Sequence, residues 1–277
     1  RDPWTQNNGR GNNIIRKLWD KFLETKILEN ATFTTTVSPL FKDQIRTTIQ
    51  KKQIHIIKNG FINDYFKNPE QSKNNQKLAI GYLGTIYKWH PVESFLKTII
   101  DLVNNENLEI ELHFYGTNIE LELKQVLNKL TVKFGDYIFF HPKTRTDQLN
   151  EKLINVNLFL LFNDYENIGT KIYDYLALKR KVILCYTNDH NANKLKKLHY
   201  NIKQKKPLST TLQSDLLRLT NAGESIKNAE ELRNAIIKIY DEFKKKRFLE
   251  VKSKNIEDYS RKIQTKKLCD LISQIKE

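Results

Sequence analysis

The sequence predicts an α/β fold with a doubly wound parallel sheet, and two observations support this prediction. From residue 78 to residue 186, apolar segments of strand length alternate with amphipathic segments of helical length. Such alternation is typical of a parallel sheet with helices on both faces. The segment Val156–Phe162 is continuously apolar, which is typical of a strand buried on both faces.

The elements of this alternation can be placed in order. The predicted strands are Leu78–Leu83, Ile110–Tyr115, Tyr137–Phe140, Val156–Phe162 and Val182–Tyr186. The predicted helices are Pro91–Val103, Ile119–Val132, Asp147–Ile154, Ile168–Leu178, Asn228–Phe248 and Ile256–Ile275, so the C-terminal third is expected to be mostly helical. Ligands of parallel sheets bind at the carboxyl ends of the strands, so we expect the functional site there.

A smaller set of elements precedes the alternation. Residues 12–29 have helical spacing of apolar side chains, and Thr32–Val37 and Gln53–Ile57 are predicted strands. Between them, Ser38 suits an N-cap and Pro39 the first position of a helix that runs to about Ile49. The polar segment Phe66–Lys77 contains Asn68-Pro69 and is the predicted linker between two units.

Composition limits the class of protein and its partners. A chain of 277 residues holds one large or two modest domains. It has 47 Lys and Arg against 32 Asp and Glu, a net charge of +15, which favours nucleotides, phospholipid surfaces or nucleic acid as partners. A lysine-rich composition inherited from an AT-rich genome explains the charge equally well.

Other features indicate where the protein acts. Cys185 and Cys269 have no metal-ligand or CxxC spacing, which favours a reduced, cytoplasmic protein. The sequence has no apolar run of about 20 residues and no recognisable signal peptide. It begins at Arg1 and contains no Met, so we expect that the native N-terminus is missing.

The segment Glu166–Leu184 carries the clearest chemical signal. It reads as a loop, a helix that opens on Gly169 and Lys171, and a strand. Such a helix start combines free backbone N–H groups, a positive dipole end and a cationic side chain, which suits a diphosphate. Glu166 and Asp174, separated by seven residues, lie on either side of it.

These residues belong to a larger resemblance. The chain resembles a GT-B glycosyltransferase of the family 4 type, a class that transfers a sugar from a nucleotide-sugar donor to an acceptor. The matching segments occur in the family's order: Arg1-Asp2-Pro3-Trp4-Thr5, Thr34–Pro39, Ile56–Phe61, Gly81–Thr85, Glu166–Leu184, and Tyr259-Ser260-Arg261 with Gln264-Thr265. Each motif alone is weak, but six in order are specific.

The resemblance implies a domain organisation. Residues 1–65 would be the C-terminal remnant of an acceptor domain, a second Rossmann-like domain, and residues 66–77 the linker. Residues 78–250 would form the donor domain, and residues 251–277 a helix that crosses back to the first domain. Most of the acceptor domain would be absent from this sequence.

The resemblance also assigns roles to individual residues. Glu166 would contact the donor sugar and Asp174 the ribose hydroxyls, since a carboxylate can accept two hydrogen bonds from a diol. The loop after Gly84 would approach the donor phosphates, and Lys88 would offset charge on the leaving group. Thr144 lies where the family holds the nucleotide base. The family usually has Glu at the position of Asp174. The loop TIYKWHP, residues 85–91, also differs from the sequence that is common in the family.

Simpler interpretations stand beside these roles. Asp174 could be a polar residue on a helix flank, and Lys171 a solvated lysine in a lysine-rich chain. Trp89 and His90 are interpreted as packing and helix-entry residues. The basic run Lys244–Arg247 is interpreted as a solvated helix face or as a contact with anionic lipid.

The resulting hypothesis is a glycosyltransferase that uses a UDP- or GDP-linked sugar and needs no metal cofactor. By family likeness it would retain anomeric configuration, act on a saccharide or lipid-linked acceptor in bacterial surface polysaccharide or glycolipid synthesis, and lie in the cytoplasm or peripherally at the inner membrane face. One alternative is a basic nucleic-acid-binding module, although no RNP, KH, zinc-finger or helix-turn-helix motif is present. Another is a GT-B fragment that binds a donor without catalysing transfer.

Overall fold

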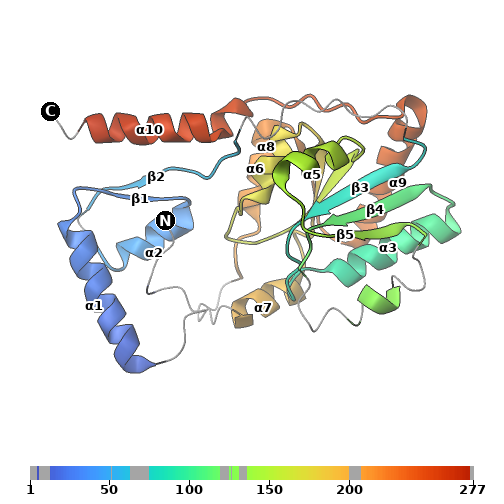
Figure 1. The fold of residues 1–277 in the computed structure, drawn as a ribbon. Coiled ribbons are helices and arrows are strands. Elements are labelled where there is room, and N and C mark those ends of the chain that lie inside the picture. Colours follow the sequence, from blue (N-terminus) through green and yellow to red (C-terminus); the bar gives the residue numbers. More distant parts are fainter. Residues whose placement is uncertain are drawn as a thin grey trace.

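The computed structural model describes residues 5, 13–50, 52–62, 75–118, 125, 127–130, 136–199 and 207–274. These residues form two lobes (Figure 1). The smaller lobe contains a two-stranded parallel sheet, and the larger contains a six-stranded sheet. Most of the predicted linker, and the motif Arg1–Trp4, lie outside the described residues.

The smaller lobe follows the predicted order of elements. It consists of α1 (Ile14–Asn30), β1 (Thr34–Thr36), α2 (Pro39–Arg46) and β2 (Ile54–Ile56), with β1 parallel to β2. The predicted cap of α2 is confirmed, because the Ser38 hydroxyl accepts a hydrogen bond from the Phe41 amide at 3.2 Å. The helix ends at Arg46, three residues before the predicted end.

The larger lobe confirms the predicted doubly wound α/β fold. Its strands are β3 (Leu78–Leu83), β4 (Ile110–Tyr115), β5 (Ile138–His141), β6 (Leu158–Phe162), β7 (Lys181–Cys185) and β8 (Gly223–Ile226). They are all parallel and lie in the order β5-β4-β3-β6-β7-β8. The direction of winding reverses between β3 and β6, so their carboxyl ends form the topological switch point, where ligands of such sheets bind.

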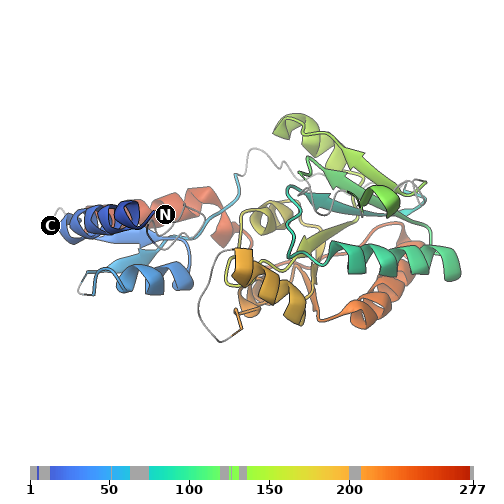
Figure 2. The same cartoon turned by 90° about the horizontal axis from the view of Figure 1, so that it is seen from below.

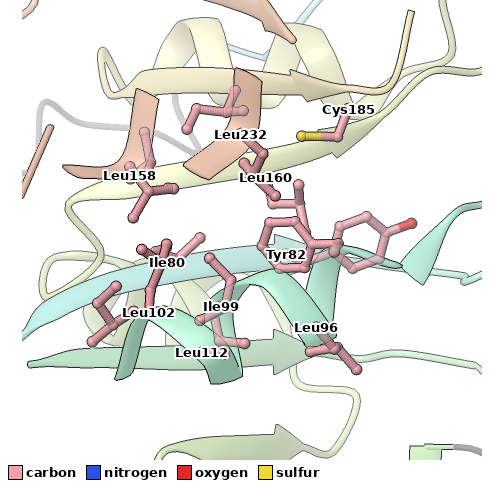
Figure 3. Close-up of a cluster of buried hydrophobic side chains, with 14 of the residues drawn as sticks. Ile80, Tyr82, Leu96, Ile99, Leu102, Leu112, Leu158, Leu160, Cys185 and Leu232 are labelled. Atoms are coloured by element: carbon pink, nitrogen blue, oxygen red, sulfur yellow. The ribbon is translucent and has the colours of Figure 1, made fainter. Parts of the chain in front are cut away.

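Helices cover both faces of this sheet. They are α3 (Val92–Asn105), α5 (Thr146–Leu153), α6 (Lys171–Ala177), α8 (Thr211–Thr220) and α9 (Ala229–Lys246). Helix α7 (His190–His199) packs in a separate cluster with Trp89 and Tyr165. One apolar cluster joins the sheet to α3 and α9, and a second joins its other face to α5, α6 and α8. In Figure 3, Ile99 of α3 lies beside Ile80 of the sheet, and Leu232 of α9 lies beside Leu160.

The structure corrects several sequence-based boundaries. Residues 187–227 contain α7, α8 and β8, which the sequence did not predict. The described part of the C-terminal third is mostly helical, as predicted, and also includes the short strand β8. β8 was missed because it has four residues and includes the partly exposed Glu224 and Ser225. Helix α6 begins at Lys171 instead of Ile168. Of the predicted helix 119–132, residues 125 and 127–130 are helical, and the others lie outside the described residues.

The last helix returns to the smaller lobe, as Figures 1 and 2 both show. After a short 3-10 turn (Glu257–Tyr259), Ser260 caps α10 (Arg261–Ser273) by accepting from the Ile263 amide. Phe61 pairs with Ser260 in a parallel β-bridge. The Lys58 amide donates to the Gln264 side chain at 3.1 Å. Backbone and side-chain hydrogen bonds therefore join the segment before the linker to α10.

Membrane spanning was tested on the described helices. In the ranges given above, no helix combines the length and the apolar character that a bilayer span requires.

We expect Gly223→Ala to destabilise the larger lobe by about 3 kcal/mol, because overpacked positions force the backbone to move. A Cβ atom at Gly223 would lie 2.1 Å from the Val182 carbonyl oxygen in β7. Urea unfolding followed by circular dichroism measures the change. Ser225→Ala in the same strand is the control and should change stability little. Equal stability of the two variants would contradict the close approach of β8 to β7.

Candidate functional site

The candidate site lies at the switch point of the six-stranded sheet. β3 and β6 are adjacent and parallel, with Ile80 opposite Leu158. Two loops therefore leave the same edge of the sheet: residues 84–91 after β3 and residues 163–170 after β6. These loops carry most of the residues to which the sequence assigned a donor-binding role.

Lys171 and Gly84 are the pair that the fold brings into direct contact. A Cβ atom at Gly84 would lie 2.5 Å from Lys171 Cε and 2.9 Å from its Nζ, so the lysine fills the space that a side chain would need. Gly84 also has φ of +91°, a conformation that glycine adopts readily. Gly84 is therefore suited to its position both by its backbone and by its missing side chain.

The Lys171 ammonium group is held by the loop after β3. It donates hydrogen bonds to the Tyr82 hydroxyl at 3.1 Å and to the Thr85 carbonyl at 3.3 Å. It also lies 4.8 Å from the centre of the Tyr82 ring, within the range of a cation–π interaction. Lys171 is thus an ordered side chain, which disfavours its interpretation as a solvated surface lysine.

Burial changes the protonation of Lys171. It lowers the pKa of this lysine to about 8, and the negative charge of Asp164 opposes part of that effect. At neutral pH the group is mostly protonated, but its charge is not fully compensated. A bound anion would stabilise it.

Asp174 lies one turn after Lys171 on α6, so the two side chains share one side of the helix. Burial raises the pKa of Asp174 to about 6, and the positive charge of Arg261 opposes this rise. Within the described part of the chain, no group donates a hydrogen bond to its carboxylate. Both carboxylate oxygens are therefore available to accept hydrogen bonds from a ligand.

Glu166 lies in the middle of the loop after β6 and is partly exposed. Its Oε1 accepts a hydrogen bond from the Ser209 amide at 3.3 Å. Gly169, with φ of +68°, turns the chain into α6. The expected helix start is thus corrected: Gly169 precedes the helix, and the seven-residue α6 has a smaller dipole than a long helix.

Lys88 and Thr144 also lie outside the contact between Lys171 and Gly84. Lys88 lies four residues beyond Gly84 and is partly buried, but the cation that reaches Gly84 is Lys171. Thr144 lies in the loop after β5, where its hydroxyl donates to the Pro142 carbonyl at 2.9 Å. The roles of Lys88 and Thr144 stay predictions.

Four residues at the site were not found from the sequence: Tyr82, Asp164, Lys196 and Gln213. Tyr82 contacts Lys171, as described above. Lys196 of α7 forms an ion pair of 2.8 Å with Asp164, and the Gln213 side chain accepts from the Asp164 amide at 2.6 Å. No local pattern identifies these contacts, because their partners are 32 to 89 residues apart in the chain.

Trp89 and His90 lie beneath these loops. Trp89 is buried and stacks on Tyr87 with ring centres 4.5 Å apart. Burial holds the pKa of His90 well below its usual value, and Lys171 and Lys196 lower it further. His90 is therefore neutral at physiological pH, and its Nδ1 accepts from the Tyr87 amide.

Among the described residues, no three His, Cys, Asp or Glu side chains are arranged to hold a metal ion. Cys185 is buried and Cys269 is exposed, and both are free thiols.

Comparisons with known proteins give a result only at the level of structure. No protein-family model matches the chain, and no curated protein matches its sequence. Solved structures do match over more than 90% of the chain. Sucrose-phosphate synthase from Thermosynechococcus elongatus is 16% identical with a TM-score of 0.62, and the match covers 93% of this chain and 62% of the synthase.

Two further matches hold nucleotides or sugars. Anabaena HepE in complex with UDP-glucose is 10% identical with a TM-score of 0.60, over 92% of this chain and 68% of HepE. The pneumococcal O-GlcNAc transferase GtfA in complex with UDP and GlcNAc is 11% identical with a TM-score of 0.58, over 91% of this chain and 47% of GtfA. The chain thus spans less than two thirds of the synthase and of GtfA. Together with the sheet order, these similarities show that the chain has the GT-B glycosyltransferase fold.

Proposed function

We propose that this chain binds a nucleotide-sugar donor and belongs to a glycosyltransferase. The observation that carries the proposal is the contact of the Lys171 ammonium group with Gly84 at the switch point. This contact holds one positive charge against the turn after β3, at the edge of the sheet where ligands of such folds bind. A diphosphate fits such a position, because its charged oxygens form strong hydrogen bonds with a cation.

The other parts of a donor fit around this contact. Asp174 shares a side of α6 with Lys171, and its free carboxylate oxygens can accept hydrogen bonds from the two ribose hydroxyls. Glu166, in the loop that leads into α6, would contact the sugar. In this arrangement Lys171, with Lys88, stabilises the negative charge that develops on the nucleoside diphosphate as the glycosidic bond breaks.

The details of the reaction are extensions of the same proposal. HepE and GtfA were solved with UDP-glucose and with UDP and GlcNAc, which supports a UDP-linked sugar ahead of a GDP-linked one. The acceptor would be a saccharide or a lipid-linked precursor in surface polysaccharide or glycolipid synthesis, and the transfer would retain configuration. The basic surface would allow peripheral contact with anionic lipid at the cytoplasmic membrane face.

A chain that binds the donor without transferring sugar is the second candidate, since this chain spans 62% of the synthase and 47% of GtfA. Labelled UDP-sugars, offered to this chain with and without an acceptor extract, separate the two candidates. Release of labelled nucleotide together with labelled acceptor supports transfer. Binding without either product supports the second candidate.

We expect UDP or GDP to raise the melting temperature of the chain, because a ligand at 100 times its Kd stabilises the folded state by about 2.7 kcal/mol. Differential scanning fluorimetry with a nucleotide panel measures the shift. Asp174→Ala should abolish it by removing the ribose acceptor. The absence of a shift with every nucleotide would overturn the donor site, and an unchanged shift in Asp174→Ala would remove this residue from it.

We expect nucleotide affinity to fall several-fold between pH 7.5 and pH 9.5, since Lys171 has a pKa of about 8 and only its protonated form attracts a diphosphate. Isothermal titration calorimetry with UDP across this range tests the dependence. Lys171→Met should bind weakly and with equal affinity at all these pH values. A wild-type affinity that stays constant up to pH 9.5 would show that Lys171 does not contact the phosphates.

We expect Asp174→Asn to stabilise the ligand-free chain by about 2 kcal/mol at pH 8, while it weakens nucleotide binding. A rise of the Asp174 pKa from 3.8 to about 6 corresponds to about 3 kcal/mol of cost for the ionised form in the folded state. The folded state binds more protons than the unfolded state between these values. The cost is therefore absent below pH 4 and complete above pH 6.

Urea unfolding of both proteins at pH 4.5, 6 and 8 measures this difference in stability. The advantage of Asp174→Asn should grow with pH over this range. A variant that is less stable than the wild type at pH 8 would show that Arg261 fully compensates the carboxylate.

A further inference from the structure

The loop after β6 needs support from outside itself. Within residues 163–170, Tyr165 has φ of +44°, a left-handed conformation that is unfavourable for a bulky side chain. The Tyr165 amide donates to the Asn163 side chain at 2.9 Å, and the Tyr165 hydroxyl donates to the Asp189 carbonyl at 3.2 Å. The loop is therefore held in an uncommon conformation by contacts with its surroundings.

Gln213 of α8 bridges the two ends of this loop. Its Oε1 accepts from the Asp164 amide at 2.6 Å, and its Nε2 donates to the Ile168 carbonyl at 3.2 Å. One planar amide thus fixes the spacing of two backbone groups on either side of Glu166. Gln213 is only 2% exposed, so its side chain has almost no surface with which to contact a ligand.

Lys196 of α7 holds the same loop from another side. Its Nζ lies 2.8 Å from Asp164 Oδ1 and also donates to the Asp164 carbonyl oxygen. The ammonium group lies 5.6 Å from the Trp89 ring centre and 5.9 Å from that of Tyr165. A lysine side chain that is only 3% exposed requires such partners, because an unpaired buried charge is very unfavourable.

The partner of Glu166 belongs to the same framework. The Asn193 side chain, on α7, pairs with both the amide and the carbonyl of Leu208 at 3.1 and 3.0 Å. Leu208 is followed directly by Ser209, whose amide donates to Glu166. Helix α7 therefore fixes both the loop and the backbone group that contacts Glu166.

From these contacts we propose that Gln213 and Lys196 are positioning residues that hold the loop 163–170 so that Glu166 and Lys171 face the donor. This inference rests on the proposed function for the identity of the ligand, but not for the anchoring of the loop. Both residues act through the backbone and the carboxylate of Asp164. Their loss should loosen the loop and weaken donor binding without removing any group that touches the donor.

The test compares Gln213→Met and Lys196→Met with a matched control at the other end of α8. Thr220 is fully buried, and its hydroxyl donates within its own helix, to the carbonyls of Leu216 and Leu217. Thr220→Val therefore removes a buried polar group of α8 without touching the loop. Gln213→Glu is the second variant at that position, since it keeps the acceptor for the Asp164 amide and loses the donor to Ile168.

Hydrogen exchange of the ligand-free full chain, followed by mass spectrometry, is the first measurement. We expect peptides that cover residues 163–170 to exchange at least tenfold faster in Gln213→Met and Lys196→Met, and at the wild-type rate in Thr220→Val. Gln213→Glu should exchange more slowly than Gln213→Met at the Asp164 amide. Unchanged loop exchange in both Met variants, or the same increase in Thr220→Val, would overturn the proposal.

Calorimetric titration with UDP is the second measurement. We expect both Met variants to lose at least tenfold in affinity and Thr220→Val to lose less than twofold. Equal affinity of the wild type and both Met variants would overturn the link between the loop and the donor. If the wild type binds no nucleotide while the loop exchange behaves as expected, the proposed function fails and the anchoring of the loop stands.

Discussion

The contact between Lys171 and Gly84 depends on the strand order and determines the rest of the site. Because β3 and β6 are neighbours, the residue after β3 and the first residue of α6 meet at one edge of the sheet. A side chain at position 84 would occupy the volume of the lysine Cε and Nζ. The ammonium group would then lose its hydrogen bond to the Thr85 carbonyl. The strand order and the missing Cβ atom of Gly84 together determine where the Lys171 ammonium group lies.

The candidate site contains two side chains whose charged forms are unfavourable because they are buried. Lys171 and Asp174 lie on one helix of seven residues, and burial shifts both pKa values toward the neutral form. The opposite charges nearby, Asp164 for Lys171 and Arg261 for Asp174, oppose these pKa shifts only in part. Lys196, by contrast, is paired with Asp164. Incomplete pairing of two opposite charges on one helix is typical of a site that a polar ligand completes.

The sequence was sufficient for the parts of the structure that local patterns determine. β3 and β6 were predicted because every residue in them is buried, which leaves an uninterrupted apolar signal. Lys171 and Asp174 were found through their spacing and the family resemblance. β8 was missed because its pairing with β7 depends on Gly223 and the close approach of Val182, and nothing in its four residues indicates a strand.

The anchors of the site could not be predicted for a different reason. Gln213 and Lys196 follow Asp164 by 49 and 32 residues, on helices that the sequence did not reveal. From the sequence alone, a lysine and a glutamine are expected at the surface, because only the fold shows the partners that allow them to be buried. Sequence patterns therefore predicted residues for a ligand site, and only the structure revealed the residues that hold the loop beside them.

Residues 259–261, which lead into α10, connect the candidate site to the smaller lobe. The Tyr259 ring lies 6.0 Å from that of Tyr173 on α6, and Arg261 lowers the pKa of the adjacent Asp174. The same Arg261 donates from its Nε to the Gly60 carbonyl at 3.0 Å, where the two lobes are joined. A Cβ atom at Gly60 would lie 2.4 Å from the Tyr259 carbonyl oxygen, so the two segments pack at backbone distance. The pKa of Asp174 therefore depends on where the junction between the lobes holds the positive charge of Arg261.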